Sequence, residues 1–320
     1  ERAQVEQLIA DYGLERLLAL QEISAGIENT NYFLDTYSQK VGEQRWVLTI
    51  FERLSSDELP FFCELTKHLA RAGFAVPAPL ESIRGDSILR VDGKPGLILN
   101  CLKGAAIDAP GEQHCRAIAE YLARMHLALR DFPRTKALVR DGEWLSSQRD
   151  LLIESAISNA ELQLLDKSVA RYQNEYKELL LACPQGIVHG DLFRDNVLFE
   201  GAKVSGVIDF YHACQASLLF DLAVLANDWA WDKELGDYDY TLLSAIVDAY
   251  QVQRPWTAME RDLWPRCLEI AALRFWISRL VSYYLPGYQK HSVEGDTAKD
   301  PNEMKAILLR AQAMKRSLLD

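Results

Sequence analysis

The sequence predicts an α+β protein of two lobes, a small lobe built on an antiparallel β-sheet and a larger, mainly α-helical lobe after it. Over the first hundred residues, short segments rich in β-branched and aromatic residues alternate with turn residues such as Gly, Asn and Pro. From Gly111 onward the apolar residues instead recur with the helical period of about 3.6 positions. The length of 320 residues suits about two domains. We therefore expect an N-terminal lobe over residues 1–100 and a C-terminal lobe over residues 101–320.

The first lobe is expected to be a sheet with few helices. Residues 23–36 have the pattern of strand, turn and strand, with Gly26 and Asn29 able to adopt turn geometry. Residues 45–52, Arg-Trp-Val-Leu-Thr-Ile-Phe-Glu, favour the next strand, because β-branched and aromatic side chains pack well on a pleated surface. The other elements expected are an amphipathic helix (1–11), a second helix (57–72), an extended segment (76–79) and two strands (87–91 and 96–101).

The second lobe is expected to consist of helices with one interruption. Ile118, Leu122, Met125 and Leu129 form one apolar stripe along the first long helix. The helical pattern breaks over residues 187–198, and residues 204–210 favour a short strand. Further helices are expected at 143–157, 161–182, 217–233, 238–252, 257–284 and 301–319.

The composition argues against several classes of partner. Lys and Arg number 35 and Asp and Glu number 46, which gives a formal charge of −11. Such a surface repels phosphate backbones and anionic lipids, so neither nucleic acid nor a membrane is expected as a partner. The start of the chain does not resemble a secretion signal. The six Cys residues show neither a Cys-x-x-Cys pair nor zinc-site spacing, so we expect reduced thiols in a cytoplasmic protein.

The residues that suggest chemistry lie where the helical pattern breaks. Asp191 and Asn196 occur within residues 187–199, and Asp209 follows in the sequence Val-Ile-Asp-Phe. Tight loops between short strands can direct three such side chains to one point. Phosphoryl transfer needs this set, because one carboxylate accepts the proton of the attacking hydroxyl while an amide and a second carboxylate hold Mg²⁺. The spacing His-x-Asp-x-x-x-x-Asn, with Asp-Phe 13 residues beyond the Asn, matches the kinase catalytic loop.

The same residues are compatible with two alternative roles. Asp191 and Asn196 belong to residue types that commonly cap turns. A metal-dependent hydrolase would use His189, Asp191, Asp209 and His212 as ligands, but it would leave the first lobe without a purpose. In a loop of this type, a histidine such as His189 more often braces the backbone than takes part in chemistry.

The sequence resembles the aminoglycoside-phosphotransferase/choline-kinase superfamily of small-molecule kinases, which share the protein-kinase-like fold. The resemblance rests on His189-Gly-Asp191 through Asn196, on Ile208-Asp-Phe210 and on Phe220-Asp-Leu-Ala223. It covers nearly the whole chain and is closest to the bacterial branch that phosphorylates L-homoserine. The stretches that support this branch are residues 24–32, 46–52, 59–62, 122–126, 227–229 and 273–279.

The resemblance implies transfer of phosphate from ATP to the hydroxyl of a small molecule, with Mg²⁺ as the metal. Asp191 would be the catalytic base, and Asn196 and Asp209 would bind Mg²⁺. His189 and Asp221 would support the loop, and ATP would bind between the lobes. The nucleotide contacts would come from a turn that could equally be a plain hairpin, and from the connection between the lobes: Ala25, Gly26, Ile27, Asn29, Asn31, Asn100 and Leu102.

One position departs from the superfamily. A kinase of this type is expected to carry a phosphate-binding Lys in its third strand, where this sequence has Thr49. A Lys–Glu ion pair therefore cannot form, and we assign no catalytic role to Glu64. Either Mg²⁺ and backbone amides hold the nucleotide, or another cation takes the place of the Lys: Arg45, Arg53 or Lys67.

An amino-acid substrate such as L-homoserine sets further requirements. Its carboxylate needs a cation, preferably the fork of an arginine, and its ammonium group needs an acid or an amide. Each residue that meets these requirements could instead serve an ion pair, a helix end or the core. The candidates are Arg194, Asn227, Asp228, Trp229, Arg274 and Arg279.

Alternatives to this function remain open at the level of the sequence. Another kinase of the superfamily, acting on an aminoglycoside, choline, methylthioribose or a sugar, would share the catalytic residues. A catalytically silent nucleotide-binding module would account for the missing Lys. The sequence does not indicate an oligomeric state.

Overall fold

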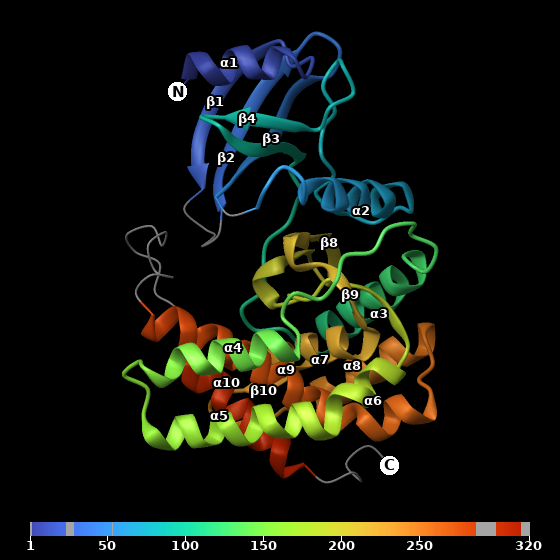
Figure 1. Cartoon of the computed structure of the whole chain (residues 1–320). Coiled ribbons are helices and arrows are strands. Elements are labelled where there is room, and N and C mark those ends of the chain that lie inside the picture. The colour runs from blue at the N-terminus through green and yellow to red at the C-terminus, as the bar shows by residue number, and fades with distance from the viewer. Residues whose placement is uncertain (1, 24–28, 53, 286–298, 315–320) are drawn as a thin grey trace. The chain divides into compact units, whose positions relative to one another are not determined.

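The computed structural model describes residues 2–23, 29–52, 54–285 and 299–314, which form two compact units (Figure 1). The β-rich unit holds the described residues up to Gly104 together with Ser205–Ile208. The α-rich unit holds the rest. The later segment belongs to the β-rich unit because, for example, the backbone N–H of Val207 donates to the carbonyl of Ala75.

The β-rich unit is an antiparallel sheet with the strand order β1-β2-β3-β5-β4. One core cluster includes Val5 and Ile9 of the first helix together with Leu34, Leu48 and Ile98 of the strands, and all of these are buried. Burial of such apolar side chains is the main source of stability for a small sheet. The elements are α1 (Arg2–Ala10), β1 (Arg16–Ile23), β2 (Asn29–Ser38), β3 (Gly42–Phe51), α2 (Leu59–Arg71), β4 (Ile88–Val91) and β5 (Lys94–Asn100).

The first strand lies earlier than the sequence suggested. Ile23 was expected to begin a strand, but it is the last residue of β1, which starts at Arg16. The second helix ends close to its predicted place, because Gly73 adopts φ +86° and so leaves the helical conformation.

The α-rich unit is built around α9, a helix of 27 residues. Most of its residues between Leu263 and Val281 are buried, as expected for a helix covered on all sides. It packs against α4, α7 and α10. The helices of this unit are α3 (Glu112–Ala128), α4 (Gly142–Ile153), α5 (Asn159–Arg171), α6 (Lys177–Ala182), α7 (Leu218–Trp229), α8 (Tyr240–Gln253), α9 (Ala258–Tyr284) and α10 (Pro301–Ala313).

Short strands interrupt the helices, and several were not predicted. The predicted strand 204–210 ends at Val207, because Asp209 takes a left-handed conformation. The single helix expected over 161–182 is divided by a π-helical turn at Tyr172–Tyr176. The short strands form three pairs: β6 (Gln185–Val188) with β9 (Cys214–Ser217), β7 (Val197–Glu200) with β8 (Lys203–Val207), and β10 (Trp231–Asp232) with β11 (Asp237–Tyr238).

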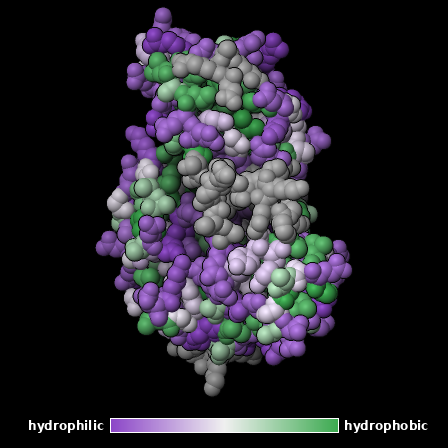
Figure 2. Space-filling model, turned by 90° about the vertical axis from the view of Figure 1, so that its left-hand side faces the viewer, coloured by the Kyte–Doolittle hydropathy of each residue, from purple (hydrophilic) through white to green (hydrophobic). Residues whose placement is uncertain are grey.

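The coloured part of the face drawn in Figure 2 is mainly polar. On the face drawn in Figure 2, hydrophilic residues prevail and hydrophobic ones form small scattered groups. Among the described residues, no helix combines the length and the apolar character that crossing a bilayer requires.

Candidate active site

A strand pair brings two distant parts of the sequence together in the α-rich unit. β6 pairs with β9 so that Val188 lies opposite Cys214. The residues that follow Val188 therefore lie beside those that precede Cys214. The rings of His189 and Phe210 are in contact, with 4.7 Å between their centroids. The loop 189–196 and the segment 209–212, which carry the predicted catalytic and metal-binding residues, thus lie against each other.

Gly190 allows this close approach. Its φ of +79° lies in the left-handed region, and a Cβ at this position would lie 2.8 Å from the carbonyl oxygen of His212. A side chain at position 190 would therefore be strained and would collide with the backbone. This packing accounts for the glycine of the His-Gly-Asp sequence.

Asp221 of α7 fixes the backbone of the loop. Its fully buried carboxylate accepts hydrogen bonds from the N–H groups of His189 and Gly190, each at 2.8 Å. Burial alone would raise the pKa of Asp221, but the hydrogen bond with His126 and the charge and amide contacts of the loop lower it. The carboxylate is therefore ionised at neutral pH and orients two consecutive amides.

Asp191 and Asn196 are in direct contact. The amide nitrogen of Asn196 donates to the backbone oxygen of Asp191 at 2.8 Å and to its Oδ2 at 3.2 Å. These bonds orient the amide so that its oxygen is the atom available to bind a cation. The buried His189 accepts a hydrogen bond at Nδ1 from the N–H of Asp191, at 3.2 Å, and so braces the same turn.

Asp209 has an unusual backbone conformation. Its φ is +62°, in the left-handed region that non-glycine residues rarely adopt. Such conformations cluster at functional sites. The carboxylate of Asp209 and the amide oxygen of Asn196 are hard oxygen donors, which suit a divalent cation that also binds phosphate oxygens. The residues present therefore fit the ion that phosphoryl transfer requires.

The alternative metal-dependent hydrolase finds no support in the geometry. Among the described residues, no group of three or more His, Cys, Asp or Glu side chains could hold a metal ion. Burial and the nearby cations Arg140 and Arg274 hold the pKa of His212 well below its usual value. The positive charges of Arg140 and Arg274 also disfavour a further cation beside His212.

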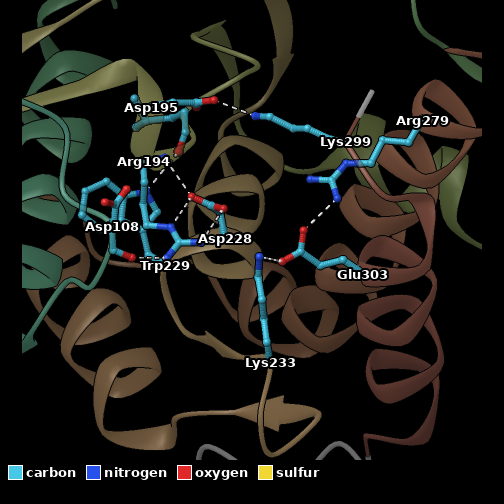
Figure 3. Close-up of polar contacts among 10 residues, drawn as sticks. Asp108, Arg194, Asp195, Asp228, Trp229, Lys233, Arg279, Lys299 and Glu303 are labelled. Carbon is cyan, nitrogen blue, oxygen red and sulfur yellow. Dashed lines mark hydrogen bonds and ion pairs between the residues drawn. The ribbon is translucent and has the colours of Figure 1, made fainter. Parts of the chain in front are cut away.

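Arg194 is bonded to the protein rather than directed to a ligand. Its Nε donates to Asp228 at 3.1 Å and its Nη1 donates to the backbone oxygen of Asp108 at 2.7 Å (Figure 3). The N–H of Arg194 also donates to Asp228, at 2.7 Å. Burial raises the pKa of Asp228 although Arg194 opposes the shift. These two predicted substrate residues hold each other.

Arg279 is occupied in the same way. Its Nη1 donates to Glu303 at 2.8 Å, and Lys233 contacts the other oxygen of Glu303 at 2.7 Å (Figure 3). On the loop itself, Lys299 pairs with Asp195 at 2.6 Å. These ion pairs join α10 and the segment before it to α9 and to the loop.

Arg274 differs from the other two predicted arginines. Its Nη1 lies 3.9 Å from Oδ1 of Asp191, and its guanidinium lies 3.8 Å from the centroid of the Phe275 ring. The residue is only 6% exposed. Of the three arginines, it is the one that approaches the predicted catalytic base.

Asn227 and Trp229 use their polar atoms inside the protein. The amide nitrogen of Asn227 donates to the backbone oxygen of Leu268 at 2.9 Å, and its oxygen accepts from the hydroxyl of Tyr238 at 2.7 Å. Trp229 donates from Nε1 to the backbone oxygen of Leu192, at 3.3 Å. Both residues are buried. They join α7 to α9 and to the loop, which accounts for their polarity without a ligand.

In the β-rich unit, the predicted nucleotide residues lie on β2 and at the end of β5. The hydroxyl of the buried Thr49 donates to Oδ1 of Asn31 at 2.8 Å, and Asn31 Nδ2 donates to the backbone oxygen of Asn29 at 3.3 Å. Asn100 ends β5, and its buried Oδ1 has no hydrogen-bond donor among the described residues. Leu102 follows in irregular backbone. The predicted residues Ala25, Gly26 and Ile27 lie outside the described residues.

The hydrogen-bond partner of Thr49 is the neutral side chain of Asn31, and two nearby cations are paired elsewhere. Arg45 pairs with Asp35 at 2.6 Å, and Lys67 pairs with Glu81 at 2.6 Å. The third cation considered, Arg53, lies outside the described residues.

Sequence reasoning missed His126, which bonds to Asp221 at 3.0 Å. The sequence signal was a histidine four residues after Leu122, on the apolar stripe of a helix. A buried position of that kind requires a polar partner, but the sequence does not identify the partner.

A pocket of the α-rich unit lies away from these residues. Its volume is about 730 Å³, and its lining includes Arg171, Tyr176, Arg266 and Gln312. Those polar groups all approach the buried Glu269. None of the predicted site residues lines this pocket.

The chain is similar to known phosphotransferases over its whole length. Curated homoserine kinases match it: that of Methylobacillus flagellatus is 39% identical over 316 residues, covering 99% of this chain and 95% of the relative. That of Neisseria meningitidis serogroup B is 38% identical over 303 residues, covering 94% of each chain.

Solved structures share the fold at low sequence identity. Amicoumacin kinase hAmiN, in complex with AMP-PNP, Ca²⁺ and Ami, superposes with a TM-score of 0.70 at 15% identity, covering 100% of this chain and 96% of that one. A microcompartment-associated aminopropanol kinase superposes with a TM-score of 0.67 at 16% identity, covering 98% and 94%. The predicted two-lobed, protein-kinase-like α+β fold and the resemblance to small-molecule kinases are confirmed. Residues 19–260 match the sequence pattern of the phosphotransferase enzyme family, and the chain belongs to this family.

Proposed function

We propose that the chain is a cytoplasmic homoserine kinase, which transfers the γ-phosphate of ATP to the hydroxyl of L-homoserine and yields O-phosphohomoserine for threonine biosynthesis. The observation that carries the proposal is the similarity to homoserine kinases, 39% identity over 99% of the chain in the case of Methylobacillus flagellatus. The contact between Asp191 and Asn196, beside the segment that begins with Asp209, supports the same chemistry.

Asp191 is proposed to orient the acceptor hydroxyl and to take its proton during attack. Asn196 and Asp209 are proposed to hold Mg²⁺ through the amide oxygen and the carboxylate. When bound, Mg²⁺ would neutralise the charge that develops on the β- and γ-phosphate oxygens. The complex of amicoumacin kinase with a nucleotide analogue and a divalent ion is consistent with this use of a metal.

We assign nucleotide binding to the lobe of residues 1–100, and catalysis and acceptor binding to residues 101–320. Within the first lobe, the proposed contacts of the nucleotide remain Ala25, Gly26, Ile27, Asn29 and Asn31. At the connection between the lobes they are Asn100 and Leu102. The unpaired buried oxygen of Asn100 supports a polar ligand at that end.

Among the predicted arginines, Arg274 is proposed to receive the carboxylate of the acceptor. The donors of Arg194 and Arg279 already serve Asp228 and Glu303, whereas Arg274 approaches Asp191, where the acceptor hydroxyl must lie. An arginine is suited to this task because its fork matches the geometry of a carboxylate.

The test is a coupled ADP-release assay with Mg·ATP. The acceptors are L-homoserine, two analogues that each lack one of its groups, choline, a sugar and an aminoglycoside. We expect L-homoserine to have the highest kcat/KM. It should exceed 3-aminopropanol, which lacks the carboxylate, and 4-hydroxybutyrate, which lacks the ammonium group. If 3-aminopropanol, choline, a sugar or an aminoglycoside were turned over as fast as L-homoserine or faster, that compound would be the substrate and the proposal of L-homoserine would be wrong. ATP binding without transfer to any of them would support a silent module.

The carboxylate assignment has its own test. Arg274→Lys should raise KM for L-homoserine about tenfold and leave KM for 3-aminopropanol unchanged, because only the first acceptor carries a carboxylate. Arg279→Lys, on the same helix but paired with Glu303, is the control and should change neither value. An equal effect of Arg274→Lys on both acceptors would assign the residue to Asp191 instead.

A further inference from the structure

A series of buried hydrogen bonds reaches the loop through Asp221, from residues to which sequence analysis assigned no catalytic or metal-binding role. His126 Nε2 lies 3.0 Å from Oδ2 of Asp221, and His126 Nδ1 lies 2.7 Å from the hydroxyl of Tyr250. That hydroxyl accepts a hydrogen bond from Nε of Arg254 at 2.8 Å. Arg254 in turn pairs with Glu260 near the start of α9.

The identity of each donor follows from its neighbours. Arg254 can only donate, so the hydroxyl of Tyr250 accepts on that side and its own proton is free to point to His126. Nδ1 of His126 is then an acceptor, and the ring proton must be on Nε2, toward the carboxylate of Asp221. Asp221 in turn orients the loop, because its carboxylate accepts hydrogen bonds from the amides of both His189 and Gly190. The donors from Arg254 through His126 all point the same way, toward the carboxylate that holds the loop.

The surroundings keep His126 neutral. Burial lowers its pKa, although the bond and the charge of Asp221 act in the opposite direction. Arg254 also lowers the pKa of His126, while Glu260 raises it. A neutral ring has one donor and one acceptor, which is what Asp221 on one side and Tyr250 on the other require.

We infer that His126 and Tyr250 are positioning residues for phosphoryl transfer: together they fix the Nε2–H tautomer that holds Asp221 against the amides of the loop carrying Asp191. The sequence assigned no role to either residue. These hydrogen-bonding side chains are buried, so few other partners can replace a lost one. Removal of the Tyr250 hydroxyl therefore leaves Nδ1 of His126 without its donor. The kinetic part of this inference rests on the proposed function, whereas the structural part does not.

The structural test is hydrogen exchange of the full-length chain, followed by mass spectrometry. Tyr250→Phe keeps the ring that fills the core and removes only the hydroxyl. We expect exchange in the peptide containing His189 and Gly190 to become about tenfold faster, with peptides from the middle of α9 unchanged. Unchanged exchange in the loop peptide, or equal acceleration in α9, would overturn the inference.

Tyr176→Phe is the matched control. It also removes a buried tyrosine hydroxyl bonded to a charged group, because Tyr176 donates to Glu269 at 3.3 Å. Glu269 has no part in the chain of hydrogen bonds that reaches the loop. Exchange in the loop peptide should therefore match that of the unmodified chain.

Two further measurements separate positioning from general stability. The ¹⁵N spectrum of histidine-labelled protein, assigned by comparison with His126→Gln, should show His126 protonated at Nε2; a ring protonated at Nδ1 would contradict the inference. In the kinase assay, Tyr250→Phe should lower kcat about tenfold and change KM for ATP less than twofold. His126→Gln, whose amide can still donate to Asp221, should retain more kcat than His126→Leu. An equal loss of kcat in these two variants would show that His126 only packs in the core and does not position Asp221.

The two proposals fail in different ways. If L-homoserine is not phosphorylated, the proposed function is wrong, but the exchange and the tautomer still report on the positioning chain. If L-homoserine is phosphorylated and the loop is insensitive to Tyr250→Phe, only the inference is wrong.

Discussion

The loop 189–196 of the α-rich unit was expected to carry the catalytic base and a metal ligand, whereas β2 of the β-rich unit was expected to contact the nucleotide through Asn29 and Asn31. The two regions are built differently. In the loop, a carboxylate from another helix fixes the backbone, and Asn196 fixes the side chain of Asp191. In the strands, two neutral side chains, Thr49 and Asn31, bond to each other where related kinases are expected to have a Lys. Of these two regions, the loop and the segment beside it therefore carry the charged side chains that are predicted to take part in phosphoryl transfer. Substitutions in the two regions should have unequal effects.

The largest effect is expected for Asp191→Ala. Loss of the proposed base should lower kcat by about 10²–10⁴-fold, because a positioned general base contributes a factor of that size. Asp195→Ala is the control on the same loop, since Asp195 is exposed and pairs with Lys299. It should stay within a few-fold of the unmodified chain in steady-state kinetics. Near-normal turnover of Asp191→Ala would show that Asp191 is not the base and that the loop is no more important for catalysis than the strands.

Asp209→Asn should have the next largest effect. A neutral amide binds a divalent cation more weakly than a carboxylate, so the Mg²⁺ concentration for half-maximal rate should rise about tenfold. A titration of activity with Mg²⁺ at saturating ATP measures it. A Mg²⁺ dependence that does not change would count against the role of Asp209 as a metal ligand.

A smaller effect is expected for two carboxylates, one in each unit, that contribute to the stability of the fold at low pH. Burial would raise the pKa of Glu303, but hydrogen bonds from Lys233 and Arg279 outweigh it and lower the pKa. The hydrogen bond from Lys67 lowers the pKa of the exposed Glu81. Because each pKa is lower in the folded chain, each group stabilises the fold above the ordinary Glu pKa of about 4.3 and loses this contribution as the pH falls through the folded-state value.

The side chain of Glu303 is 21% exposed, whereas that of Glu81 is 55% exposed, so water screens the ion pair of Glu81 more strongly. Glu303→Gln should therefore reduce the loss of unfolding free energy between pH 5 and pH 3 more than Glu81→Gln does. Urea unfolding at a series of pH values measures this difference. A larger effect of Glu81→Gln would show that the ion pairs of the β-rich unit are the stronger ones.

The smallest effect is expected for Thr49→Val. The change keeps the shape of the side chain and removes one hydrogen bond to Asn31, which should lower the unfolding free energy by no more than about 1 kcal/mol. KM for ATP should change less than twofold. A tenfold rise in KM for ATP would instead give the strand a direct part in phosphate binding.

The sequence predicted best what depends on local pattern. The apolar stripe of Ile118, Leu122 and Met125 located α3, because a single face of a helix must be buried. The start of β1 at Arg16 was missed, since its half-buried positions do not alternate clearly. The π-helical turn after Arg171 left no signal in the sequence.

For the site, prediction was limited by partners that are distant in sequence. The spacing of Asp191 and Asn196 was informative because both residues belong to one loop. The occupation of Arg194 by Asp228 and of Arg279 by Glu303 depends on how helices pack, and spacing along the chain does not report it. The same limit hid His126, whose partners are 95 and 124 residues away in the sequence.

The close approach of Gly190 to the carbonyl of His212 makes one steric unit of two sequence motifs. A methyl group at position 190 would push on the segment that begins with Asp209, so a single mutation would disturb both motifs at once. In a saturation-mutagenesis library selected for growth, position 190 should accept almost no replacement.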